Sequence, residues 1–224
     1  MGQDITLTAS DKFELGAYRT TPAGTPKGAV VVIQEIFGVN HHIRTVCDRF
    51  AAQGYVAVAP SIFDRTERNF QSGYSEAEVA IARKFVAAPN WPAMLLDTQA
   101  AIDSVGDVGP VGIIGFCLGG SVAYAAATKL TGLSAAIGYY GGAIVRFADD
   151  RPTVPTQLHF GAEDHGIPLS DVEIIRAKRP EVEVFVYDGA QHGFGCDERA
   201  SYDKPSADLA RQRSLAFFAK HLVK

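Results

Sequence analysis

Short apolar segments alternate with longer segments of helical periodicity along most of this chain. The apolar segments are rich in Val and Ile and are bounded by Gly or Pro, as the buried strands of parallel sheets usually are. Central strands are predicted at residues 29–34, 55–59, 111–116, 135–139, 156–160 and 182–187. This alternation predicts an α/β fold in which a mostly parallel central sheet is flanked by helices on both faces.

The remaining segments complete this prediction. Residues 5–8 and 13–19 alternate polar and apolar side chains, which predicts a hairpin at the edge of the sheet. Helices are predicted at 75–88 and 91–105, directly after the strand that ends at Phe116, and near the end of the chain. No internal repeat or linker-like stretch interrupts the pattern, so residues 1–224 are expected to form a single domain.

Composition excludes several classes of protein. The chain has 224 residues, 47% of them hydrophobic, and a net charge of −4, which gives no reason to expect nucleic acid or an anionic membrane as a partner. No apolar run reaches the roughly 18 residues that a membrane helix needs, and the N-terminus does not resemble a signal peptide. Three scattered cysteines are too few for a disulfide framework. We therefore expect a cytoplasmic protein, monomeric and without a cofactor.

The segment Gly115-Phe116-Cys117-Leu118-Gly119 joins a predicted strand to a predicted helix. This is the context of a nucleophile elbow, in which the nucleophile sits on a sharp turn and needs small neighbours two residues away on either side. The Leu118 N–H would lie at the helix N-terminus, where it can donate to a developing oxyanion. A lone free cysteine is more often a small buried hydrophobe. The flanking glycines in this context favour Cys117 as a nucleophile.

Two further residues complete a predicted triad. Asp164 and His192 each follow a predicted strand, in glycine-containing loops on the same edge of the sheet. His192 would act as the base toward Cys117, and Asp164 would orient its imidazole. Glu163 is the alternative acid. The histidines show neither H-x-x-H nor H-E-x-x-H spacing, so no metal site is predicted.

Taken together, these motifs resemble the dienelactone hydrolase family (carboxymethylenebutenolidases), and the resemblance covers nearly the whole chain. It rests on five segments: Gln34-Glu35-Ile36-Phe37-Gly38, Gly115-Phe116-Cys117-Leu118-Gly119-Gly120, Gly138-Tyr139-Tyr140-Gly141, Gly161-Ala162-Glu163-Asp164-His165-Gly166-Ile167-Pro168 and Gly189-Ala190-Gln191-His192-Gly193-Phe194. The resemblance implies an α/β-hydrolase fold. It also implies cleavage of a small ester or lactone substrate through a thioester with Cys117.

The resemblance also implies further roles in the site. Glu35 would lie beside the nucleophile and compete with His192 for the thiol, and the Ile36 N–H would be the second oxyanion donor. Tyr139 and Phe37 would line the substrate pocket. Two alternatives stay open: Glu35 could be a strand-end acid in a local salt bridge, and Tyr139 could be an aromatic residue of the core.

One position departs from the family pattern. Members that cleave dienelactone have an arginine four residues after the catalytic histidine, and here that position is Cys196. Arg199 and, more loosely, Arg83 are the candidates to bind a substrate carboxylate, and Cys196 is expected to line the pocket. Loss of an arginine clamp would weaken the binding of an acidic lactone. A non-catalytic binding protein of the same fold and a Cys–His peptidase are the alternative functions.

Overall fold

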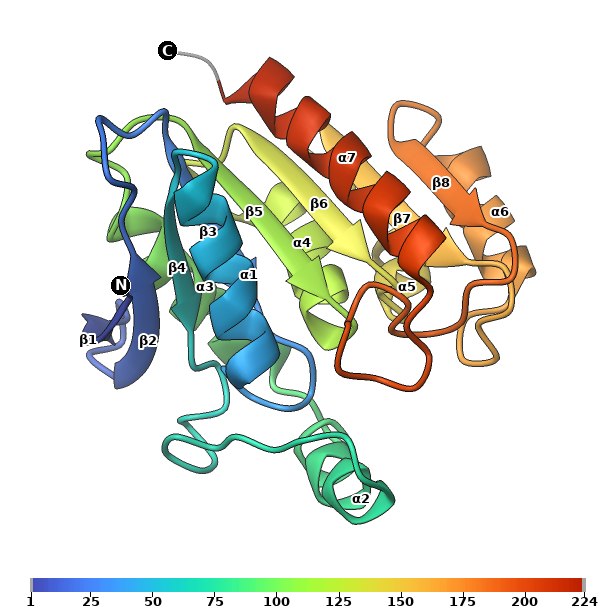
Figure 1. Ribbon diagram of the computed structural model, residues 1–224, viewed down its shortest axis with the longest axis horizontal. Helices are drawn as coiled ribbons and strands as arrows, with labels where there is room; N and C mark the ends of the chain where they lie inside the picture. Colours follow the sequence, from blue (N-terminus) through green and yellow to red (C-terminus); the bar gives the residue numbers. More distant parts are fainter. Residues whose placement is uncertain (1, 223–224) are drawn as a thin grey trace.

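A single eight-stranded sheet forms the centre of the computed structural model, which describes residues 2–222 (Figure 1). The spatial order of its strands is β1-β2-β4-β3-β5-β6-β7-β8. The strands are β1 (Gln3–Thr8), β2 (Glu14–Thr20), β3 (Ala29–Ile33), β4 (Val56–Pro60), β5 (Val111–Phe116), β6 (Ala135–Tyr139), β7 (Thr156–Gly161) and β8 (Glu183–Tyr187). Neighbouring strands from β4 to β8 are parallel, and β1 and β2 pair antiparallel.

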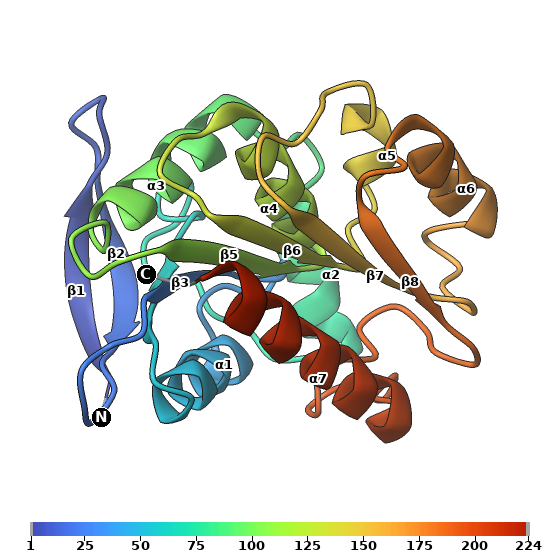
Figure 2. The same cartoon turned by 90° about the horizontal axis from the view of Figure 1, so that it is seen from above.

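Helices cover both faces of the sheet. They are α1 (His41–Ala52), α2 (Glu76–Phe85), α3 (Trp91–Asp103), α4 (Leu118–Lys129), α5 (Ile144–Phe147), α6 (Leu169–Lys178) and α7 (Lys204–His221). Figure 2 shows α1 and α7 on one face and α3, α4, α5 and α6 on the other. All residues of β3, β4, β5 and β6 are buried, since both of their faces are covered. Among the described helices, none is long and apolar enough to cross a membrane.

The loops that follow the parallel strands meet at one edge of the sheet. Ile33 at the end of β3 pairs in register with Gly115 of β5, and Phe116 pairs with Tyr139 at the end of β6. The segments that begin after these strands are therefore neighbours, and α2 lies beyond the same edge (Figure 1). This is the edge at which open α/β sheets bind their ligands.

The predicted fold class is confirmed, and each of the six central strands lies within one residue of its predicted bounds. The predicted hairpin at the edge of the sheet is confirmed. β2 pairs with β4 as well as with β1, so β1 alone is at that edge. The helix predicted at 75–88 ends at Phe85, and α6 has too few buried residues, Val172 and Ile175, to show a clear helical pattern in the sequence.

Candidate active site

Cys117 occupies a sharp turn between β5 and α4. Its backbone has φ 55° and ψ −116°, a conformation that costs an L-residue free energy and that often marks a functional site. A Cβ at Gly115 would lie 1.9 Å from the Gly119 carbonyl oxygen, so this turn closes only around glycine. The Cys117 N–H donates to the Tyr139 carbonyl at 3.0 Å. Cys117 is partly exposed, whereas Cys47 and Cys196 are buried.

His192 and Asp164 are joined by a hydrogen bond at the ends of β7 and β8. The distance from His192 Nδ1 to Asp164 Oδ2 is 2.8 Å. The other carboxylate oxygen of Asp164 accepts the Gly166 N–H at 2.8 Å, which fixes the side chain. Asp164 is buried and Glu163 is exposed, so the structure pairs His192 with the predicted acid rather than with the alternative one.

The surroundings of His192 favour its charged form. Burial lowers the pKa of the imidazole, but the charge of Cys117 and the hydrogen bond that His192 donates to Asp164 raise it more, and the resulting pKa is about 10. The ring centroid of Tyr140 lies 5.1 Å from that of His192. These contacts favour the imidazolium form of His192, which lies between Asp164 and the sulfur of Cys117.

The resemblance predicts the N–H groups of Leu118 and Ile36 as oxyanion donors, and both residues belong to segments that meet at the elbow. Leu118 is the first residue of α4, and its N–H has no partner within the helix. Ile36 follows β3 in the segment against which α4 packs. A Cβ at Gly119 would lie 2.4 Å from the Ile33 carbonyl oxygen and 2.5 Å from that of Gln34. This close approach brings the elbow against the segment that carries Ile36.

Glu35 forms an ion pair with Arg199, at a distance of 2.9 Å between Oε1 and Nη1. Glu35 is 1% exposed, and the Tyr74 hydroxyl lies 3.5 Å from its other oxygen. Burial lowers the pKa of Arg199, but the charges of Glu35, Tyr140 and Cys117 outweigh it and hold the pKa above its ordinary value. The structure thus shows Glu35 in an ion pair. Its partner is distant in sequence rather than local.

The other predicted pocket residues separate into two groups. Phe37 is buried, with its ring centroid 4.7 Å from that of Tyr74 and 5.7 Å from the Arg199 guanidinium. Cys196 is buried as well, and its thiol donates to the Tyr74 hydroxyl at 3.3 Å. Arg83 instead lies exposed on α2 and has no ion-pair partner among residues 2–222. Arg199 is the candidate arginine that reaches the site.

Tyr139 is buried in the hydrophobic core, which agrees with the alternative of an aromatic core residue. Its hydroxyl is 2.7 Å from Ser214 Oγ on α7, and its ring lines a cavity of about 420 Å³ that Cys117 and His192 do not line. The next residue, Tyr140, has φ 37° and lies against His192. The sequence analysis missed Tyr140 and Tyr74, although Tyr140 stands beside Tyr139 in one of the five quoted segments.

Comparison with known proteins agrees with this geometry. The model of the dienelactone hydrolase family matches residues 15–222. A protein of Synechocystis sp. is 35% identical over 233 residues, which cover 95% of this chain and 94% of that protein. The carboxymethylenebutenolidase of Pseudomonas putida is 31% identical over 227 residues, covering 97% and 96%. A solved structure from Klebsiella pneumoniae, classed with the dienelactone hydrolases, has a TM-score of 0.85 at 29% identity and covers 98% of this chain and 99% of its own. The chain belongs to the dienelactone hydrolase family and has its α/β-hydrolase fold.

Proposed function

We propose that this hydrolase cleaves small esters or lactones with Cys117 as nucleophile, His192 as acid and base, and Asp164 as the residue that orients His192. One observation carries the proposal. A cysteine in a strained elbow, Cys117, interacts with His192, which a buried carboxylate holds at 2.8 Å. That arrangement is the one that nucleophilic acyl transfer requires.

In the first half of the reaction, the Cys117 sulfur attacks the carbonyl carbon of the substrate. The electron pair of the carbonyl moves onto its oxygen, which the N–H groups of Leu118 and Ile36 stabilise. When the intermediate collapses, the bond to the leaving oxygen breaks and His192 gives that oxygen its proton. The product of this half is a thioester on Cys117.

Water completes the reaction in the second half. His192, now neutral, takes a proton from a water molecule as the water attacks the thioester carbonyl. The carbon–sulfur bond breaks and the acid product leaves. The proton on His192 restores the resting state, in which Asp164 stabilises the imidazolium through Nδ1.

For the substrate, we propose a lactone that carries a carboxylate. Arg199 supports this substrate class because its side chain is only 21% exposed and its charge is close enough to Cys117 to interact with it. A planar guanidinium is suited to bind a carboxylate through two hydrogen bonds. Glu35 holds Arg199 in place through the ion pair at 2.9 Å. A relative from Pseudomonas putida is named for the same class of substrate.

The test is parallel turnover of cis- and trans-dienelactone and of a neutral aryl acetate. We expect Arg199→Gln to lower kcat/KM for the dienelactones by on the order of 10²-fold and to affect the neutral ester much less, since the neutral ester has no carboxylate to bind. Arg83→Gln is the matched control. It removes the other arginine that the sequence offers as a carboxylate ligand, which is exposed on the surface.

The outcomes separate the two levels of the proposal. Turnover of the neutral ester alone by the wild type would leave the hydrolase mechanism standing and reject the carboxylate-bearing substrate. A larger loss of kcat/KM for the dienelactones with Arg83→Gln than with Arg199→Gln would mean that Arg83, and not Arg199, binds the carboxylate. Absence of turnover with every ester, and of any acylated protein by intact mass, would reject the mechanism itself.

Protonation of His192 should also stabilise the fold in a defined pH window. Its pKa in the folded protein, about 10, lies above the ordinary value of about 6.5. The stabilisation is therefore complete below about pH 6.5 and is lost as the pH rises through about 10. We expect the free energy of unfolding of wild type minus that of His192→Gln, from urea unfolding, to fall across this window.

A control of opposite sign is available in the same chain. Burial and then Lys220 lower the pKa of His221. The free energy of unfolding of wild type minus that of His221→Gln should therefore not fall as the pH rises. If the difference for His192→Gln stays constant or grows with pH, the ion-pair description of His192 is wrong.

A further inference from the structure

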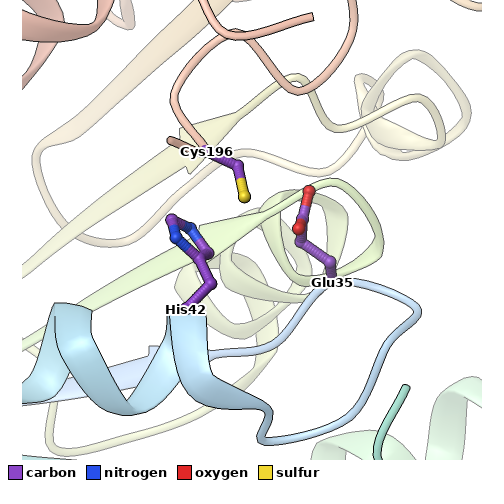
Figure 3. A group of neighbouring side chains, drawn as sticks. All are labelled: Glu35, His42 and Cys196. Carbon is purple, nitrogen blue, oxygen red and sulfur yellow. The ribbon is translucent and has the colours of Figure 1, made fainter. Parts of the chain in front are cut away.

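Three side chains of the kinds that bind metal ions meet beside the site, each from a different segment. Glu35 follows β3, His42 lies in the first turn of α1, and Cys196 lies between β8 and α7 (Figure 3). One ligand atom of each lies within 4.8 Å of the other two, and all three residues are buried. We propose that Glu35, His42 and Cys196 together bind one Zn²⁺ ion.

His42 is the side chain that points most directly to a ligand. It is 1% exposed, yet neither ring nitrogen forms a hydrogen bond with any residue in the described part of the chain. A buried polar group left in this condition costs free energy, which a metal bond would remove. Figure 3 shows the ring turned toward Cys196 and Glu35.

A carboxylate is also placed to support His42. Asp197 Oδ1 lies 3.5 Å from His42 Nδ1, and the two atoms do not form a hydrogen bond. Metal-bound histidines usually donate their second ring N–H to a carboxylate, which fixes the ring and makes the other nitrogen a better ligand. A small movement of Asp197 would give it this role.

The geometry is close to that of a zinc site. Three atoms within 4.8 Å of one another share a point that is no farther than about 2.8 Å from each of them. Zinc binds sulfur at about 2.3 Å and nitrogen or oxygen at about 2.0–2.2 Å. Each ligand therefore needs to move by less than about 1 Å to close around an ion at that point.

The donors suit zinc in charge as well as in type. A thiolate, a neutral imidazole and a carboxylate are all ligands that zinc accepts, and three of them leave the fourth tetrahedral position for water. On binding, Cys196 would release its thiol proton to solvent, and the two anionic ligands would balance the charge of the ion. Arg199 contacts only Oε1 of Glu35, whereas Oε2 accepts a long hydrogen bond of 3.5 Å from the Tyr74 hydroxyl, which the metal would replace. The Tyr74 hydroxyl, 3.3 Å from Cys196 Sγ, could then donate to the thiolate.

Metal binding here does not depend on the proposed reaction, but the two would be linked through Glu35. The same carboxylate holds Arg199 at 2.9 Å, so an ion bound to Glu35 would compete for the group that positions this arginine. Binding is therefore measured directly, without ester turnover as a readout.

The experiment is a titration of the purified full chain with Co²⁺ and then Zn²⁺. Cobalt replaces zinc in such sites and absorbs in the near-ultraviolet when a thiolate is a ligand. The Cys117→Ser background removes the catalytic thiol and leaves Cys196 next to His42. We expect one Co²⁺ per chain with the thiolate absorption, and its displacement by Zn²⁺.

Single substitutions in this background identify the ligands. Cys196→Ser should abolish the absorption, and His42→Asn should weaken cobalt binding by at least about 10- to 100-fold, because loss of even an outer partner of a metal ligand has an effect of that size. His41→Asn is the matched control. It changes the neighbouring histidine, whose side chain is 84% exposed and paired with Glu198, and it should leave binding unchanged.

Two results would overturn the proposal. One is an absorption that Cys117→Ser removes, which would place the metal at Cys117 and His192 instead. The other is binding that Cys196→Ser or His42→Asn leaves intact, or no stoichiometric binding at all. Circular dichroism and thermal unfolding of each variant without metal show that a loss of binding is not a loss of folding. An inactive protein that binds cobalt as expected would reject the proposed reaction and leave the metal site standing.

Discussion

Replacing Cys117 by alanine should lower kcat/KM for ester hydrolysis by roughly 10⁴-fold or more. The substitution removes the sulfur that attacks the carbonyl and forms the thioester, while the N–H groups of Leu118 and Ile36 stay in place. Residual activity would come only from the oxyanion site and from substrate binding. Steady-state turnover of a neutral aryl acetate gives the rate. Intact mass after rapid quenching should show an acyl adduct on the wild type and none on Cys117→Ala.

Cys47→Ala is the matched control for this measurement. Cys47 is a fully buried cysteine of α1 that packs in the hydrophobic core and takes no part in the site. Its loss should leave kcat/KM within a few-fold of wild type and lower stability by about 1–2 kcal/mol, because a buried sulfur is removed. Wild-type turnover by Cys117→Ala, or an acyl adduct on that variant, would contradict the proposed nucleophile.

The fold was predictable because its strands carry their own signal. Strands that are covered on both faces, such as β3 and β5, are continuous apolar runs, and glycine or proline marks their ends. The pairing of β2 with β4 had no such signal, since β4 follows β2 in the chain only after β3 and α1. Nothing local to a strand identifies a partner that other elements separate from it in sequence.

In the site, too, residues in local sequence motifs could be predicted, whereas contacts between distant residues could not. Cys117, Asp164 and His192 follow strand ends in recognisable segments, and the structure brings Asp164 to 2.8 Å from His192. The partner of Glu35 is Arg199, which is 164 positions away and follows no motif. Only the folded chain reveals that ion pair.

Tyr139 and Tyr140 were harder to assign because they are adjacent aromatic residues at the end of a strand. Successive side chains of a strand point to opposite faces, so an error of one residue exchanges core and site. Tyr139 ends β6 and reaches Ser214 on the α7 face. Tyr140 turns toward His192 through a positive φ, which a sequence pattern does not show for a tyrosine.

Gly119→Ala should be strongly destabilising, with a loss of at least about 3 kcal/mol in the free energy of unfolding. A Cβ there would lie 2.4 Å from the Ile33 carbonyl oxygen and 2.5 Å from that of Gln34. Both contacts are with backbone atoms, which no side-chain rotation can relieve. Either α4 or the segment after β3 must move.

That movement should reach the chemistry as well as the stability. The segment after β3 carries Ile36 and Glu35, so any Gly119→Ala protein that folds should also lose oxyanion stabilisation, by about 10²-fold in kcat. Urea unfolding and turnover of an aryl acetate measure the two effects. Gly24→Ala is the matched control, because a Cβ at Gly24 would meet nothing within 4 Å, and its stability should stay within about 1 kcal/mol of wild type. A Gly119→Ala protein with wild-type stability and turnover would mean that α4 does not pack against the β3 segment as closely as the structure has it. The proposed role of the Ile36 N–H as an oxyanion donor would then lose its support.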